Sequence, residues 1–212
     1  EAQLTSIHYP EIAALARSLS GADEVLLGSH ILRNPEQAAV HEDLGPIQFV
    51  HSDFAASYHD RLIAFYAGNT PEAAASLGGT LKASDVARAR RLLILQFWRN
   101  VGASVMDLPL AFCDARTVPA EEVLPAPVQD YAGGGFDFET LAILPARAGE
   151  HAWYTFPAMQ VDEVVAFRTY DSARVGTDQP FWTPHSAYRD PAVALGAPSR
   201  YSIELRATCL WF

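Results

Sequence analysis

The chain has 212 residues, of which 50% are hydrophobic and 19% are charged, and its formal net charge at pH 7 is −10. This composition is typical of a globular protein with a substantial core rather than of a disordered chain. An acidic balance disfavours a nucleic-acid partner, because neutralising phosphates requires clustered lysine and arginine. No apolar run approaches the ~18 residues of a membrane-spanning helix. We therefore expect neither a nucleic-acid nor a membrane partner.

The two ends of the chain and its cysteines indicate a cellular compartment. The first residues, Glu1 to Thr5, lack the basic and then apolar pattern of a secretory leader. Two cysteines, Cys113 and Cys209, are few for this length and favour buried thiols over a disulfide. We expect a cytoplasmic protein. The absence of repeats and linkers predicts one domain over residues 1–212, with room for a further N-terminal segment before Glu1.

The N-terminal part is expected to mix short helices and strands. Tyr9 to Ser20 predicts a helix, because Pro10 suits a first helical turn and Gly21 suits a helix end. The other elements of this part are predicted as strands at residues 24–32 and 47–51 and as helices at residues 55–67 and 84–91.

From Leu92 onward the pattern changes to short apolar and aromatic runs separated by proline, glycine and aspartate. These predicted strands cover residues 92–98, 108–113, 138–144, 153–156, 164–167, 181–184 and 201–211. Many short strands with a few helices at one end favour a mainly β fold with flanking helices, namely a sandwich or jelly roll.

The most informative motif is His51-Ser52-Asp53. Residues two apart on an extended strand face the same side, so an imidazole and a carboxylate enter the same cavity. These are two ligands of the 2-His-1-carboxylate triad, which leaves open positions on a non-haem iron. Alone the triplet is weak evidence, because a histidine and an aspartate at a strand end often only pair with each other.

Two later segments supply the rest of a site. His185, after Phe181-Trp182-Thr183-Pro184, is the predicted third ligand, since a jelly roll brings a late strand beside an early one. Arg200 and Ser202 share a face at the start of the last strand. An arginine can hold a carboxylate through two parallel hydrogen bonds, and a serine hydroxyl can add a third. Arg206 lies on the same face and is the alternative carboxylate anchor.

A rival triplet, His41-Glu42-Asp43, has the same spacing. It lies between proline and glycine in a predicted loop rather than in an apolar strand, so it ranks behind His51. The tryptophans Trp98, Trp153 and Trp182 are expected to be core or pocket wall.

An ordered series of motifs makes the chain recognisable. The series comprises Phe49-Val50-His51-Ser52-Asp53, Phe97-Trp98-Arg99, Asp107 to Ala111, Cys113 to Arg116, Trp153 to Pro157, Asp162-Glu163-Val164, Tyr170-Asp171-Ser172, Thr183-Pro184-His185 and Arg200 to Arg206. It resembles the hydroxylase/desaturase family of fungal and bacterial secondary metabolism, which includes gibberellin-desaturase-like enzymes and a cephamycin hydroxylation component. The resemblance spans most of the chain, although Asn100 stands where that family's pattern leads us to expect proline.

The resemblance implies a double-stranded β-helix, Fe(II), 2-oxoglutarate as co-substrate and O2. The implied function is a dioxygenase that hydroxylates, desaturates or oxidatively cyclises a small secondary-metabolite precursor. Five aromatic residues are expected to flank the pocket: Phe49, Phe54, Trp153, Phe156 and Trp182. Two other hypotheses use the same residues: a zinc hydrolase, which leaves Arg200 and Ser202 without a role, and a jelly-roll binding module without turnover.

Overall fold

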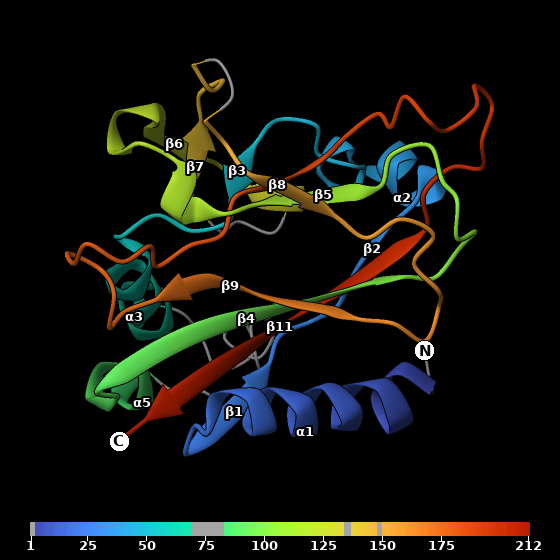
Figure 1. Cartoon of the computed structure of the whole chain (residues 1–212). Coiled ribbons are helices and arrows are strands. Elements are labelled where there is room, and N and C mark those ends of the chain that lie inside the picture. The colour runs from blue at the N-terminus through green and yellow to red at the C-terminus, as the bar shows by residue number, and fades with distance from the viewer. Residues whose placement is uncertain (1–2, 69–82, 134–136, 148–149) are drawn as a thin grey trace.

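The computed structural model describes residues 3–68, 83–133, 137–147 and 150–212 (Figure 1). The predicted loops around Gly68 to Gly79 and Gly133 to Gly135 fall largely outside this part of the chain. Two antiparallel sheets face each other, and this arrangement confirms the predicted mainly β jelly-roll fold.

The first sheet is built on the two longest strands. Its strands are β1 (Glu24–Leu27), β2 (Ile31–Arg33), β4 (Arg91–Asn100), β9 (Val165–Asp171) and β11 (Ser202–Trp211). They lie in the order β1-β11-β4-β9, with β2 also pairing β11. β4 and β11 pair along their whole lengths, from Ser202 opposite Asn100 to Trp211 opposite Arg91.

The second sheet carries shorter strands in the order β6-β7-β3-β10-β5-β8. Their bounds are β3 (His51–Ser52), β5 (Leu110–Cys113), β6 (Val123–Val128), β7 (Phe138–Ile143), β8 (Trp153–Thr155) and β10 (His185–Ala187). Because β3 and β10 are adjacent, residues from early and late in the chain meet in the middle of this sheet (Figure 1).

The helices lie around the first sheet and at the ends of the molecule. α1 (Tyr9–Ser20) follows a short π-helical turn (Leu4–His8) and covers the outer face of the first sheet (Figure 1). As predicted, it ends at Gly21, which adopts φ 65°. The other helices are α2 (Pro35–Val40), α3 (Tyr58–Gly68) and α5 (Ala83–Arg88), with 3-10 turns at Glu42–Leu44, Ala115–Thr117, Ala120–Glu122 and Tyr131–Gly133.

Alternation along β11 decides which side chains reach the site. Leu205, Ala207 and Cys209 pack with Ile12 and Ala16 of α1 on the outer face. By the two-residue period, the even-numbered residues of β11 therefore face the second sheet. This inner face carries the polar residues that the sequence pattern singled out.

Several predicted elements differ from the structure. The strand expected at 24–32 is two strands, both paired with β11. The strand expected at 47–51 is only β3, and the one expected at 181–184 begins at His185. α2 was not predicted, although Asn34 caps it by accepting from Gln37 N at 2.7 Å.

β6 also escaped prediction, because Pro125 and Pro127 argue against a strand. β6 is an edge strand, where a missing N–H is tolerated. The spacing of Leu19 with Ile12 and Leu15 predicts that it shares the buried face of α1, but Leu19 is 57% exposed.

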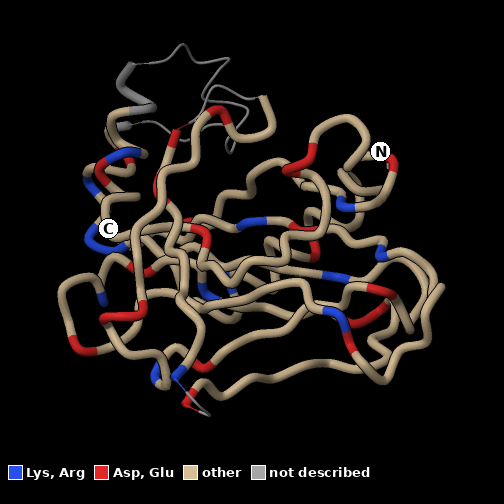
Figure 2. The backbone as a smooth tube through the Cα atoms, turned by 90° about the horizontal axis from the view of Figure 1, so that it is seen from above, with Lys and Arg blue, Asp and Glu red and all other residues tan. Residues whose placement is uncertain are grey.

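The cysteines, the lengths of the helices and the distribution of charge were also considered in the sequence. Cys113 and Cys209 are both free and buried, as expected. No helix among the described residues is both long and apolar enough to cross a bilayer. Acidic and basic residues are interspersed around the described backbone (Figure 2).

Candidate active site

The structure brings His51, Asp53 and His185 together at the centre of the second sheet. His51 of β3 and His185 of β10 are directly opposed across the antiparallel pair, so their side chains share a face. Asp53 follows β3 by one residue. All three side chains are buried, and one ligand atom from each lies within 4.8 Å of the others.

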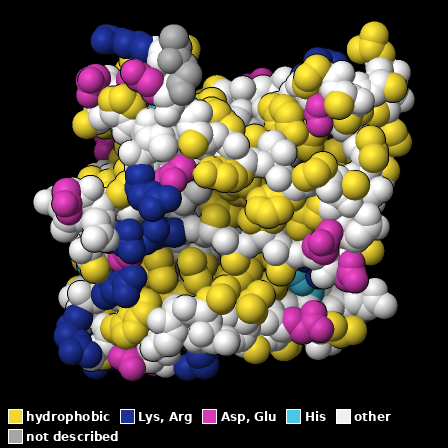
Figure 3. Space-filling view, in the orientation of Figure 1, with side chains coloured by type: hydrophobic (Ala, Val, Ile, Leu, Met, Phe, Trp, Pro, Cys, Tyr) yellow, Lys and Arg dark blue, Asp and Glu magenta, His cyan; other side chains and the backbone are white. Residues whose placement is uncertain are grey.

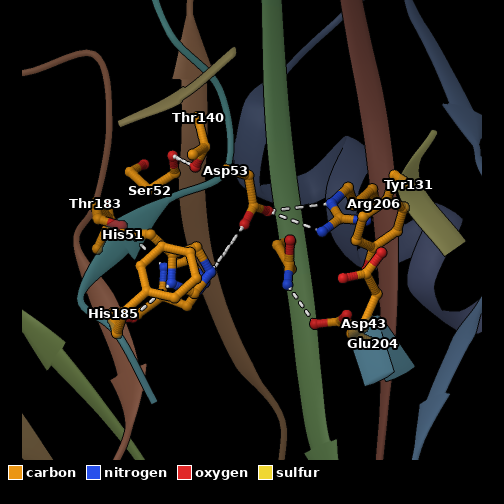
Figure 4. Close-up of polar contacts among 12 residues, drawn as sticks. Asp43, His51, Ser52, Asp53, Tyr131, Thr140, Thr183, His185, Glu204 and Arg206 are labelled. Atoms are coloured by element: carbon orange, nitrogen blue, oxygen red, sulfur yellow. Dashed lines mark hydrogen bonds and ion pairs between the residues drawn. The ribbon is translucent and has the colours of Figure 1, made fainter. Parts of the chain in front are cut away.

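The donor atoms of the three side chains point at one another (Figure 4). Asp53 Oδ1 lies 3.7 Å from His51 Nε2 and 3.5 Å from His185 Nε2. The two imidazole rings lie 4.5 Å apart between centroids. Among the described residues this is the single group of three such side chains able to hold a metal ion.

Backbone contacts orient both imidazoles. His51 Nδ1 donates to Phe49 O at 2.9 Å, and His185 Nδ1 donates to Thr183 O at 3.1 Å. A proton fixed on Nδ1 leaves the Nε2 lone pair free, which is the arrangement of metal-binding histidines. Burial, together with His185, lowers the pKa of His51 to about 4, so this imidazole is neutral near pH 7.

Arg206 holds the carboxylate of Asp53. Its Nε and Nη2 both donate to Asp53 Oδ2, at 3.1 and 3.0 Å. Burial by itself raises the pKa of the Asp53 carboxyl, but the charge of Arg206 and the contact with His185 outweigh it and lower the pKa below its ordinary value. Asp53 is therefore a carboxylate, and its Oδ1 remains free for the histidine side. Two imidazoles that present Nε2 and a carboxylate fit a divalent iron.

Arg200 and Ser202 lie at the start of β11, and neither residue lines the large cavity beside the triad or the smaller hollow near Trp98. Arg200 is 3% exposed, donates from Nη1 to Leu108 O at 3.2 Å, and has its guanidinium carbon 6.0 Å from the Trp98 ring centroid. Its Nε and the Ser202 hydroxyl are buried, and neither has a hydrogen-bond partner among the described residues. Burial, together with Arg33, lowers the pKa of Arg200 to about 10.

A cavity of about 640 Å³ opens beside the triad. It is lined by His51, Asp53 and Arg206 together with aromatic and aliphatic side chains, among them Phe49 and Phe54. Such a mostly apolar cleft with a few convergent polar groups is typical of a small-molecule site.

The aromatic residues predicted to flank the pocket divide into two groups. Phe49 and Phe54 line the large cavity, whereas Phe156 lines a separate hollow of about 210 Å³. Trp153 and Trp182 line neither cavity, so that part of the prediction is wrong. Hydrophobic side chains also gather in the middle of the face seen in Figure 3.

The rival triplet does not form a metal site. His41 Nδ1 lies 3.5 Å from Asp43 Oδ2, and both side chains are partly exposed. Among the described residues, no third metal-binding side chain joins this pair. Asp114 and Arg116 form the expected ion pair at 2.6 Å.

Sequence reasoning missed a second polar cluster beside the site. Glu204 accepts from Arg33 Nε at 2.9 Å and from Gln96 Nε2 at 2.6 Å, and Arg33 also donates to Tyr131 Oη at 2.9 Å. Arg33 and Tyr131 line the cavity. The one local signal was Glu204, an acid on the inner face of an apolar strand.

Comparison with known proteins identifies the family. A family model described as an oxidoreductase/YMDC permease-like domain matches residues 1–210. The chain belongs to this family. Its relatives include the hydroxylase/desaturase efuI of Hormonema carpetanum, 28% identical over 96% of the chain and 70% of the relative. The Fe(II)/2-oxoglutarate-dependent dioxygenase nvfI of Aspergillus novofumigatus is 29% identical over 97% of the chain and 66% of the relative.

Another family relative is the hydroxylase/desaturase CTB9 of Cercospora beticola, with 26% identity over 96% of the chain and 63% of the relative. The chain thus spans about two thirds of the length of these relatives. The solved iron and alpha-ketoglutarate-dependent endoperoxidase NvfI has the same fold, with a TM-score of 0.73 and 24% identity over 99% of the chain and 70% of that structure. The predicted hydroxylase/desaturase membership and the double-stranded β-helix are confirmed.

Proposed function

We propose that the protein is an Fe(II)/2-oxoglutarate-dependent dioxygenase acting on a small secondary-metabolite precursor, with His51, Asp53 and His185 as the iron ligands. The observation that carries the proposal is the convergence of two Nε2 atoms and one carboxylate oxygen in a buried site beside a large cavity. Relatives named as Fe(II)/2-oxoglutarate-dependent dioxygenases and hydroxylase/desaturases support the reaction class.

Iron with 2-oxoglutarate and O2 supplies the oxidation of an unactivated C–H bond. The protein's own residues orient and isolate that chemistry. Phe49 O and Thr183 O fix the tautomers of the two histidines, and Arg206 holds Asp53 so that Oδ1 faces them. The apolar cavity wall keeps water from the reacting bond and sets which carbon of the substrate faces the site.

Arg200 and Ser202 are proposed to bind the distal carboxylate of 2-oxoglutarate. A buried guanidinium N–H and a buried hydroxyl without partners are costly unless a ligand satisfies them. A carboxylate also offsets the uncompensated charge indicated by the lowered pKa of Arg200. Arg206 is the weaker candidate for this anchor, because its Nε and Nη2 already hold Asp53.

The cavity supports an organic substrate with an apolar body. Its wall includes Phe54, Tyr58, Leu62, Ile94 and Phe138. Hydroxylation, desaturation and oxidative ring closure all begin with loss of hydrogen from such a body. The pose of the substrate decides among them.

An anaerobic titration with Fe(II) and then 2-oxoglutarate tests the reaction class. An iron-chelated 2-oxo acid gives a weak visible charge-transfer band, which a zinc hydrolase or a metal-free binding module cannot produce. The band should appear with the native protein and be absent from His185→Ala. No band at saturating Fe(II) and 2-oxoglutarate contradicts the proposal.

A screen of small metabolites, scored by succinate release above the uncoupled background, tests the substrate class. Stimulation by small metabolites is expected. Stimulation by peptides or oligonucleotides alone would overturn the small-molecule part of the proposal while leaving the iron site intact.

A further inference from the structure

Tyr131 lines the large cavity, and its hydroxyl group can still donate a hydrogen bond. The Tyr131 oxygen accepts from Arg33 Nη2 at 2.9 Å. A phenol oxygen that accepts a hydrogen bond keeps its O–H as a donor. Within the described parts of the chain, no acceptor for that proton is found, and the residue lines the cavity.

Arg33 holds the Tyr131 oxygen from a rigid position. This arginine is 5% exposed, and all its nitrogens are engaged. Nε donates to Glu204 at 2.9 Å, and Nη1 donates to Gly45 O at 2.9 Å and to Asp43 O. A guanidinium fixed by a buried carboxylate and two carbonyls cannot swing away from the phenol. It therefore fixes where the phenol oxygen lies.

The backbone that carries Tyr131 is held in a strained conformation. Asp130 and Ala132 have φ of 48° and 51°, a region that costs energy for residues with a side chain, and Gly133 follows at 72°. Ala132 N donates to Asp43 Oδ2 at 2.9 Å, which ties the turn to the opposite cavity wall. Such strain persists where the surroundings over-determine it, and it is enriched at ligand-binding positions.

The ring of Tyr131 lies among aromatic side chains. Tyr131 and Phe138 meet edge to face with centroids 5.9 Å apart, and Phe138 in turn contacts Phe54 at 5.8 Å. Both phenylalanines line the cavity. A donor fixed in a mostly apolar wall discriminates between ligands, because a ligand without an acceptor leaves the donor unpaired.

We propose that Tyr131 is a substrate-binding residue that donates a hydrogen bond to a carbonyl or hydroxyl oxygen of an otherwise apolar substrate, and that Arg33 is the residue positioning it. The inference rests on the proposed function only in taking the large cavity as the substrate site. Arg33 pairs with Glu204, which lies two residues before Arg206 on the inner face of β11, and Arg206 holds Asp53. In Figure 4, Tyr131, Glu204 and Arg206 lie beside the candidate iron ligands.

The test compares two rigid probes that differ in one oxygen, 9-fluorenone and fluorene. Binding is measured by fluorescence titration under argon, with and without Fe(II) and 2-oxoglutarate. Native protein should prefer fluorenone, and Tyr131→Phe should lose about 5-fold in fluorenone affinity while fluorene affinity stays unchanged. The carbonyl stretching band of bound fluorenone should lie at lower frequency in native protein than in Tyr131→Phe.

Arg33 variants test the positioning role. Arg33→Lys keeps a charge beside Glu204 but cannot reach all the acceptors, and the double variant Arg33→Gln, Glu204→Gln removes both charges of the buried pair. Both variants should lose the fluorenone preference and the carbonyl shift. A merely structural role of Arg33 would weaken both probes equally. Tyr9→Phe, which removes a hydroxyl contact to His30 outside the cavity, is the matched control and should change neither measurement.

The proposal is overturned if native protein shows no saturable fluorenone binding, or if Tyr131→Phe retains both the preference and the band position. An unchanged carbonyl band in both Arg33 variants overturns the positioning role. These readouts need no turnover. Loss of the preference in Tyr131→Phe, combined with no charge-transfer band from native protein at saturating Fe(II) and 2-oxoglutarate, would therefore refute the dioxygenase proposal and leave this one standing.

Discussion

Arg206 and Asp53 form an ion pair across the space between the two sheets, with both guanidinium bonds on a single carboxylate oxygen, Oδ2. The other oxygen, Oδ1, is left on the histidine side. Arg206 thereby orients a proposed metal ligand. Arg200, six residues earlier, retains a buried N–H that has no partner in the part of the chain that the structure describes. This difference separates the roles of two arginines that the sequence could not rank firmly.

Removing the support should weaken metal binding. Arg206→Met should lower Fe(II) affinity about 10–100-fold, the usual effect of losing a group that orients a metal ligand. Anaerobic isothermal titration measures this change. Arg116→Met, which breaks an exposed ion pair, is the control. Unchanged Fe(II) affinity with a raised KM for 2-oxoglutarate would move Arg206 to the co-substrate anchor.

Replacing a proposed iron ligand should lower Fe(II) affinity more than replacing Arg206 does. His51→Ala, Asp53→Ala and His185→Ala should each lose Fe(II) affinity by at least the about 10–100-fold expected for an orienting group. Each should also abolish substrate oxidation while circular dichroism stays native-like. His41→Ala removes the histidine of the rival triplet and should bind Fe(II) normally. Full turnover by His185→Ala would refute the triad assignment.

The co-substrate anchor should respond to charge more than to a single hydroxyl. Arg200→Ala should raise the KM for 2-oxoglutarate by the equivalent of about 2–5 kcal/mol, because the bound carboxylate loses a desolvated charged partner. Ser202→Ala should cost about 1 kcal/mol. Succinate release at saturating Fe(II) and substrate gives both values. A larger effect at Ser202 than at Arg200 is inconsistent with the proposed anchor.

The packed core between the sheets should dominate stability. Leu210 is 0% exposed and packs with Leu92 and Ile94, so Leu210→Ala should lower the free energy of unfolding by about 2–5 kcal/mol. Leu195 is 92% exposed, and the same substitution there should stay within about 0.5 kcal/mol. Urea unfolding measures both. Equal losses at the two positions would contradict the assignment of the core.

The sequence alone determined features that depend on neighbouring residues. Gly21 ends α1 because glycine readily adopts the left-handed backbone conformation that closes a helix. The two-residue period of a strand placed Ser202 and Arg206 on one face of β11. The two-residue spacing of His51 and Asp53 predicted that both would enter one site, and they do. The series of motifs indicated the family and hence the fold.

Only the tertiary structure decided the contacts between distant segments. His185 opposes His51 because β10 inserts between β3 and β5, a strand order that no local pattern specifies. Arg33 reaches Glu204 for the same reason, since β2 pairs with β11. The energies that select these pairings come from burying whole sheet faces and satisfying buried charges. These energies depend on the assembled fold, so they cannot be predicted from any single residue or short motif.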